Sequence, residues 1–186
     1  MKTFQEFMVE CYVVVEGNPT TRMITKSNTK LIGHISADRG SDESKNRKSR
    51  GSLENDLQKH GIGYQKGVGE YKYSSGEGTG REVGLVTSPR KSKPGSRPMS
   101  KRRFGKIMRR LGRKHGQESV ITKDSDKPAK LHTTEKGSKD TSITLGKSKP
   151  GKHPQGYGET SGTKIRSGKL PNKTTKPAYH YGENDN

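Results

Sequence analysis

The first apolar positions of the chain follow a helical pattern and then a strand pattern. Between positions 4 and 12 they recur at intervals of three and four residues, which places them on one face of an α-helix. A β-branched run at 12–15 then predicts a short strand. The face comprises Phe4, Phe7, Met8, Cys11 and Tyr12. On this pattern alone, the segment is typical of the first helix of a small domain.

Further along the chain, short apolar runs predict strands over 22–26, 31–37 and 82–87. Alternating apolar residues between Gly61 and Tyr73 predict a hairpin. These runs are short and separated by turn residues, so the strands they form are expected to be short as well.

The polar segment 40–51 (GSDESKNRKSRG) contains no large apolar residue and predicts a long loop. Ser52 is then expected to cap a short helix that carries Leu53 and Leu57. Gly61 stands where a helix commonly ends in a left-handed residue.

A second helix is expected after Ser100, and it is very basic. Phe104, Ile107, Met108 and Leu111 recur at helical spacing and form one apolar stripe. The helix is expected to end at Gly116 and to lead into a strand at 118–121. Eight cations occupy its other positions without any acid: Lys101, Arg102, Arg103, Lys106, Arg109, Arg110, Arg113 and Lys114.

Two interpretations of this helix are possible. An ordinary charge run is the solvated face of a helix that packs on a core. Eight like charges without an acid four residues away repel one another, however, and a polyanion would relieve that repulsion. We therefore predict that the eight residues contact phosphates. If half of them contact phosphates, the logarithm of the DNA-binding constant should fall with the logarithm of the salt concentration at a slope of about −4.

Composition restricts the class of protein. Only 23% of the 186 residues are hydrophobic, and 38 Lys and Arg against 19 acids give a formal charge of +19. A charge of this size favours a polyanionic partner. The single cysteine excludes an internal disulfide framework. No apolar run approaches the length of a membrane span, so we expect no membrane partner.

The C-terminal third is rich in Gly, Pro, Ser, Thr and Lys and shows no periodicity. We therefore expect an α+β fold: a small mixed domain at 11–122 with short strands and two or three short helices. A basic linker near 88–99 interrupts this domain, and a long disordered basic tail follows at 123–186.

No catalytic constellation is visible in the sequence. The six histidines do not pair with Cys or with one another at metal-ligand spacing, and the glycine-rich stretch 67–80 lacks the order of a P-loop. His60 and His115 each precede a helix-ending glycine, where an imidazole can meet the last carbonyls. We therefore expect no enzyme activity, no metal and no cofactor.

The string MKTFQEFMVEC at 1–11 resembles the capsid-targeting leader of the internal head proteins of large T4-type tailed phages. The resemblance implies that residues 1–10 dock into the prohead scaffold. It also implies that the prohead protease cuts after Glu10, where Met8, Glu10 and Cys11 form the recognition site. It competes with the interpretation of an ordinary first helix.

The interior strings ISADRG, DLQKHGIGY, GEYKY, REVGLVT and LGRKHGQESVI are similar to a small domain family of unknown function from bacteria and tailed phages. The similarity spans 31–121. It implies a compact α+β domain and no particular activity.

The function expected from these features is that of a phage internal head protein. It would be packaged with the genome, bind DNA without sequence preference, lose its leader and enter the host cytoplasm with the DNA, where a host protein is a possible partner. One alternative is a phage accessory nucleic-acid-binding protein that acts only in the infected cell. Another is a virion structural protein with extended basic arms.

Overall fold

The computed structural model describes residues 31–72, 79–92, 94–125, 127–137, 139, 141–150, 162–165 and 178–182. Two helices lie in these ranges, α3 (Glu43–Lys59) and α4 (Lys101–Lys114). The strands are β1 (Leu31–Ser36), β2 (Ile62–Lys72), β3 (Thr79–Pro89), β4 (Ser119–Asp124), β5 (Ala129–Thr133), β6 (Ser142–Pro150), β7 (Gly162–Ile165) and β8 (Ala178–Gly182).

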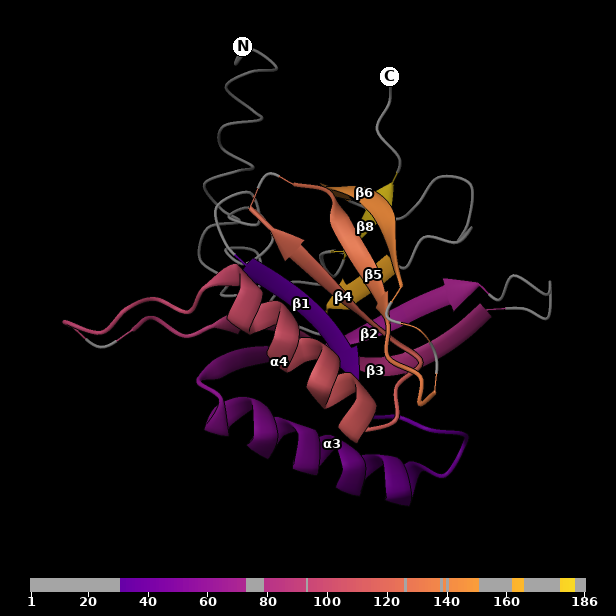
Figure 1. Ribbon diagram of the computed structural model, residues 1–186. Helices are drawn as coiled ribbons and strands as arrows, with labels where there is room; N and C mark the ends of the chain where they lie inside the picture. Colours follow the sequence, from indigo (N-terminus) through magenta and orange to yellow (C-terminus); the bar gives the residue numbers. More distant parts are fainter. Residues whose placement is uncertain are drawn as a thin grey trace, which may run out of the picture.

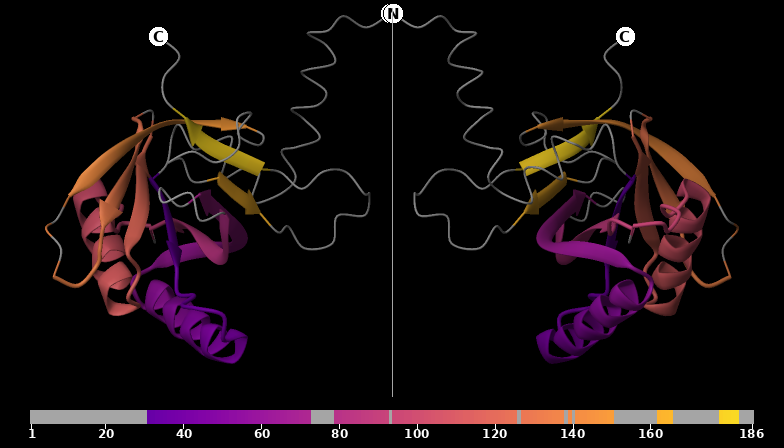
Figure 2. Two further views of the ribbon diagram at one scale, coloured as in Figure 1. Left: turned by 90° about the vertical axis from the view of Figure 1, so that its right-hand side faces the viewer. Right: turned by 90° about the vertical axis from the view of Figure 1, so that its left-hand side faces the viewer.

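The strands form a closed antiparallel barrel in the order β1-β3-β2-β7-β8-β6-β5-β4, and β4 pairs back with β1. Both helices lie against the outside of this barrel (Figure 1). Helix α4 contacts β1 and β4, and α3 contacts β2. In the two side views, the helices cover one side and the lower end of the barrel, away from β7 and β8 (Figure 2).

Both faces of the sheet contribute buried residues, and each has its own core. Alternate residues of a strand point to opposite faces, so Ile35 and Leu85 belong to the outer core while Ile32 and Val86 belong to the inner one. The outer core joins the strands to α3 and α4 through Leu53, Leu57, Phe104, Ile107, Met108 and Leu111. The inner core fills the barrel and includes Ile121, Ala129, Leu145 and Tyr181.

Two glycines allow α4 to approach the sheet closely. A Cβ at Gly33 of β1 would lie 2.8 Å from Met108 Cε and 2.8 Å from Thr87 Oγ1. A Cβ at Gly112 of α4 would lie 2.8 Å from Val120 Cγ1. Side chains of α4 therefore pack directly on the backbone of β1 at Gly33, and a side chain of β4 packs directly on the backbone of α4 at Gly112.

The predicted α+β class is confirmed: the described part is a small mixed domain with an antiparallel sheet and two helices. Strands are present where 31–37, 82–87 and 118–121 predicted them. Helix α4 is capped by Ser100, whose side chain accepts a hydrogen bond from Arg103 N at 3.3 Å. Gly61 and Gly116 take the expected left-handed conformation, with φ of 70° and 62°.

The loop predicted at 40–51 was wrong, because α3 begins at Glu43. Asp42, not Ser52, is the N-cap, and its carboxylate accepts a hydrogen bond from Lys45 N at 3.1 Å. The first two turns are held by polar contacts: buried Asn46 accepts a bond from Arg39 N at 2.7 Å. A hydrophobic pattern cannot reveal a helix that is fixed in this way.

The hairpin predicted within 61–73 was also wrong. Residues 62–72 form one strand, β2, which pairs along its whole length with β3, from Ile62 with Pro89 to Lys72 with Thr79. The hairpin is therefore larger and its second strand lies beyond residue 78.

Strands are also present beyond residue 122, the predicted end of the domain. Strand β4 continues to Asp124 and pairs with β5, which pairs with β6. Strands β7 and β8, from the segment predicted to be a disordered tail, pair with β2 and β6 and close the barrel. The strands predicted at 12–15 and 22–26 and the leader at 1–10 lie outside the described residues.

Candidate nucleic-acid interface

The direction in which α4 presents its cations follows from its apolar stripe. Phe104, Ile107, Met108, Leu111 and Gly112 are all buried against the barrel. The cations occupy the remaining positions of the helical wheel, so they face away from the core. Arg109 is half-buried, and the other seven cations are exposed: Lys101, Arg102, Arg103, Lys106, Arg110, Arg113 and Lys114.

The two end cations of α4 are paired with acids. Lys101 Nζ lies 3.3 Å from Asp124 Oδ2 of β4, and Lys114 Nζ lies 2.7 Å from Asp56 Oδ2 of α3. These pairs attach opposite ends of α4 to different neighbours. They partly neutralise the two ends of the helix.

Asp56 is the centre of the contact between the helices. His115 Nε2 lies 2.9 Å from the same Oδ2 atom that Lys114 contacts. The hydrogen bond from Lys114 lowers the pKa of the Asp56 carboxyl most, and the bond from His115 acts in the same direction, while burial opposes both. Asp56 is therefore held in its charged form.

The imidazole of His115 was expected to meet the last carbonyls of α4. In the structure, the backbone N–H of His115 bonds to Leu111 O at 2.9 Å, while the ring turns to Asp56. His60 likewise caps α3 through its backbone, by bonds to Asp56 O and Leu57 O.

Between the paired ends, five cations have no hydrogen bond or ion pair through their side chains to any residue that the structure describes. They are Arg102, Arg103, Lys106, Arg109 and Arg110. Arg113 has a further interaction and is not counted with them. We call these five residues the basic face of α4.

The basic face is concentrated on one helix. Arg102, Lys106 and Arg109 stand at i, i+4 and i+7, so they form a row opposite the apolar stripe, and Arg103 and Arg110 lie beside this row. At a rise of about 1.5 Å per residue, the row is about 10 Å long. Among the uncharged residues of α4, Gly105 alone is not buried.

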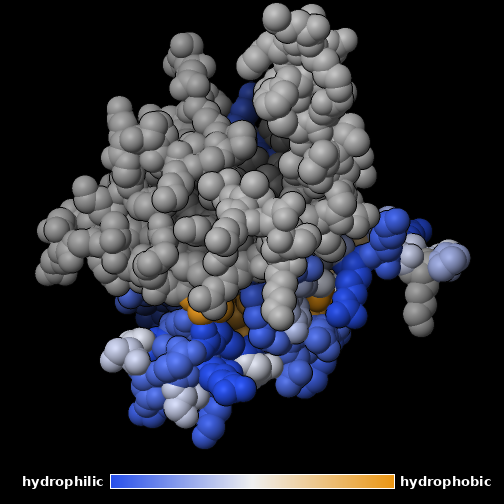
Figure 3. All heavy atoms as spheres, turned by 180° about the vertical axis from the view of Figure 1, so that it is seen from behind, coloured by the Kyte–Doolittle hydropathy of each residue, from blue (hydrophilic) through white to orange (hydrophobic). Residues whose placement is uncertain are grey.

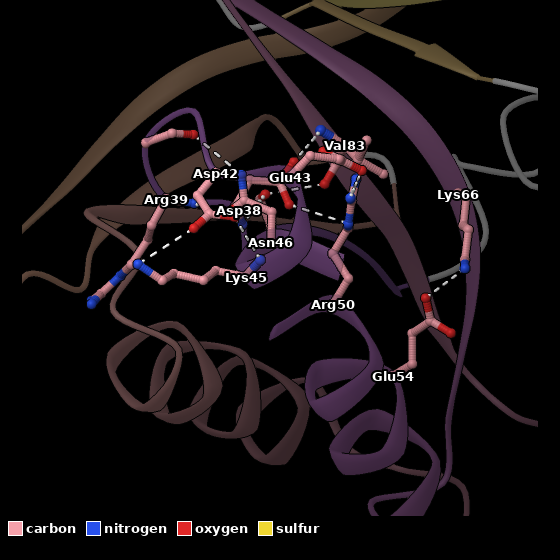
Figure 4. Close-up of polar contacts among 12 residues, drawn as sticks. Asp38, Arg39, Asp42, Glu43, Lys45, Asn46, Arg50, Glu54, Lys66 and Val83 are labelled. Atoms are coloured by element: carbon pink, nitrogen blue, oxygen red, sulfur yellow. Dashed lines mark hydrogen bonds and ion pairs between the residues drawn. The ribbon is translucent and has the colours of Figure 1, made fainter. Parts of the chain in front are cut away.

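A second polar cluster lies beside the N-terminal half of α3 (Figure 4). Arg50 points toward Asp38, with Nε 3.4 Å from Oδ1, and it also pairs with Glu43. The contact at Asp38 Oδ1 is an ion pair without a hydrogen bond, whereas Asp38 Oδ2 accepts a bond from Val83 N at 2.9 Å.

A pocket of about 480 Å³ opens next to this cluster, between α3 and strands β2 and β3. Its acids are already engaged: Glu54 accepts a bond from Tyr64 Oη at 2.8 Å and pairs with Lys66 at 2.7 Å. Burial, and then the bond to Glu54, raises the pKa of Tyr64. The cluster ties α3 to the sheet and offers far less unpaired charge than α4.

On the face seen from behind, the described residues that are visible are mostly hydrophilic (Figure 3). Ile143, 58% exposed, is the large hydrophobic side chain that stands out among the described residues. Within the same residues there is no group of three or more His, Cys, Asp or Glu placed to hold a metal ion. Neither described helix is long and apolar enough to cross a membrane.

The structure thus brings all eight predicted residues onto one helix, pairs Lys101 and Lys114 with acids, and leaves the five cations of the basic face without side-chain partners among the described residues. The acids of those pairs were missed, because Asp56 and Asp124 lie 58 and 23 positions from their partners. The predicted cleavage residues Met8, Glu10 and Cys11 lie outside the described residues. The chain matches no protein-family model and no curated protein, so both resemblances stay predictions.

Proposed function

We propose that this chain is an internal head protein of a tailed phage that binds DNA without sequence preference through the basic face of α4. The observation that carries the DNA-binding part is the set of five cations that have no side-chain partner among the described residues, on a helix whose other side is buried against the barrel. Arg and Lys in this arrangement suit the phosphate backbone, which has the same charge at every base pair.

The rigidity of α4 supports the proposal energetically. Its buried stripe and its two end ion pairs position the cations before any partner arrives. Binding then has no helix to fold, and the repulsion among the five cations is relieved when phosphates replace water around them. Contact of three of them with phosphates contributes a salt slope of about −2.7.

The test is the affinity of the full chain for duplex DNA after reversal of three charges on the basic face: Arg102→Glu, Lys106→Glu and Arg109→Glu. The matched control reverses three exposed cations of α3, through Arg47→Glu, Lys48→Glu and Lys59→Glu. Both variants have the same net charge, so a general loss of attraction affects them equally.

We expect the α4 variant to bind at least about a hundredfold more weakly than the control at low salt, since three phosphate contacts are replaced by repulsion. Thermal unfolding of both variants checks that the fold is retained. Equal affinities of the two variants would contradict a role for α4.

The head location rests on the leader-like string at 1–11 and needs a separate test. The N-terminal mass of the protein from purified particles should correspond to a chain that starts at Cys11, and the mass from infected cells before assembly to the uncut chain. A protein that is absent from particles would leave the first alternative, a nucleic-acid-binding protein of the infected cell.

A further inference from the structure

Two glycines lie inside helices without a packing reason among the described residues. A Cβ at Gly51 of α3 would have no heavy atom within 4 Å. A Cβ at Gly105 of α4 would meet only Arg109 Nη1, at 3.4 Å, which is the end of a flexible side chain. Gly112 differs, because a Cβ there would collide with Val120 and Thr134.

Glycine in the middle of a helix lowers its stability relative to alanine, because glycine loses more backbone freedom on folding. At Gly51 and Gly105 the fold gains nothing visible in return. A glycine of this kind is also used where another molecule comes close to the backbone.

The surroundings of the two glycines distinguish them. Gly51 lines the pocket beside α3, where Arg50 is paired with Asp38 and Glu43. Gly105 lies at the edge of the basic face, three residues after Arg102 and four before Arg109. These two arginines have no side-chain partner among the described residues, and a polyanion is attracted there.

The Arg109 side chain shows how the space above Gly105 is arranged. Side chains of a helix lean toward its N-terminus, so a residue covers the turn that precedes it. The guanidinium of Arg109 accordingly lies over Gly105, at the edge of the space that a Cβ would fill. A group seated over Gly105 can reach this guanidinium.

We infer that Gly105 is the point at which a phosphate group of the DNA backbone comes closest to α4, with Arg109 as its ligand. This inference rests on the proposed DNA binding. The missing Cβ lets the phosphate approach the helix more closely, and Coulomb attraction to the cations grows as the distance falls. Recognition of this kind involves phosphates and no base edges.

The experiment uses the full chain and measures both the melting temperature and the affinity for duplex DNA. Gly105→Ala and Gly105→Leu change no charge. Gly51→Ala and Gly51→Leu are the matched controls, because both glycines are interior to a helix and both have room for a side chain. The charge-reversed α4 variant described above is measured beside them.

We expect Gly105→Ala and Gly51→Ala each to raise the melting temperature by about 2–4 °C. Only the Gly105 variants should bind DNA more weakly, by about fivefold for alanine and by more for leucine, as one phosphate contact is lost. The salt slope of the Gly105 variants should become shallower by about 0.9, although their charge is unchanged. A purely structural role cannot produce a more stable protein with a shallower salt slope.

The outcomes separate the inference from the proposed function. If the Gly105 variants bind as well as the Gly51 variants while the charge-reversed protein loses binding, Gly105 is not the contact point and the DNA-binding role of α4 stands. If the charge-reversed protein also retains its affinity, both are overturned.

Discussion

Gly33 of β1 is the position where a single methyl group should disturb the fold most clearly. In Gly33→Ala, the new Cβ would lie 2.8 Å from Met108 Cε, 2.8 Å from Thr87 Oγ1 and 3.1 Å from Phe104 Cζ. Real carbon contacts are wider than this, so α4 must move or its side chains must leave their places. Met108 can yield most easily, because its methyl group is the end of a flexible side chain.

Thr87 and Phe104 have less freedom. Thr87 is completely buried and donates a hydrogen bond from Oγ1 to Gly33 O at 3.0 Å, and Phe104 is only 1% exposed. Overpacking of a dense core costs about 1–3 kcal/mol. Since two of the three neighbours cannot yield, we expect about 2 kcal/mol of lost unfolding free energy.

Urea unfolding of Gly33→Ala, compared with Gly63→Ala, measures this loss. Gly63 lies in β2, and a Cβ there would have its nearest neighbour at 3.6 Å, an ordinary contact. The control should therefore lose much less stability. Equal losses in the two variants, or none in Gly33→Ala, would refute the close approach of α4 to β1.

Two further predictions concern ionisable groups. Burial lowers the pKa of His34 from 6.5 to about 3, and Tyr181 Oη lies 2.7 Å from His34 Nε2. As the pH drops below 6.5, His34 is protonated in the unfolded chain before it is protonated in the folded one, so the free energy of unfolding falls. Because His34 keeps some exposed surface, we expect the free energy of unfolding in urea to fall by about 1–2 kcal/mol from pH 7.5 to pH 5. His34→Gln should not show this fall, and identical pH profiles of the two proteins would disprove the prediction. The pKa of Asp56 is lowered in the folded protein, so its charged form stabilises the fold above the ordinary carboxyl pKa, and this stabilisation is lost as the pH falls through the folded pKa. We therefore expect Asp56→Asn to lower the free energy of unfolding by about 1–2 kcal/mol at pH 7 and by progressively less in acid. A deficit that does not change with pH would show that the charge of Asp56 is not what joins the helices.

The parts of the fold that could be predicted are those with local signals. The stripe of Phe104, Ile107, Met108 and Leu111, the Ser100 cap and the terminal Gly116 all lie within one stretch of the sequence and together specify α4. The outward direction of the eight cations follows from the same stripe.

The parts that were missed depend on distant partners. The first turns of α3 are fixed by Asn46 and Arg50, whose contacts are with Arg39 and Asp38 in the segment after β1. Strands β5 and β6 contain few apolar residues each, and Ala129 and Leu145 become core only when the barrel closes around them. The bond between His34 and Tyr181 spans 147 positions, which no local pattern can reveal.

The candidate site was predicted in outline but not in its electrostatics. Which cations remain without partners depends on Asp56 and Asp124, and their positions follow from the packing of α3 and β4 beside α4. These two pairs, together with the further interaction of Arg113, reduce eight equivalent charges to a basic face of five.

The most direct measurement is the salt dependence of DNA affinity for the full chain and for its Arg102→Glu, Lys106→Glu, Arg109→Glu variant. The difference between the two slopes isolates α4 from cations elsewhere in the chain. We predict that the slope of the variant is shallower by about 2.7, the value for three phosphate contacts. Parallel slopes with equal affinities would contradict DNA binding by the basic face of α4.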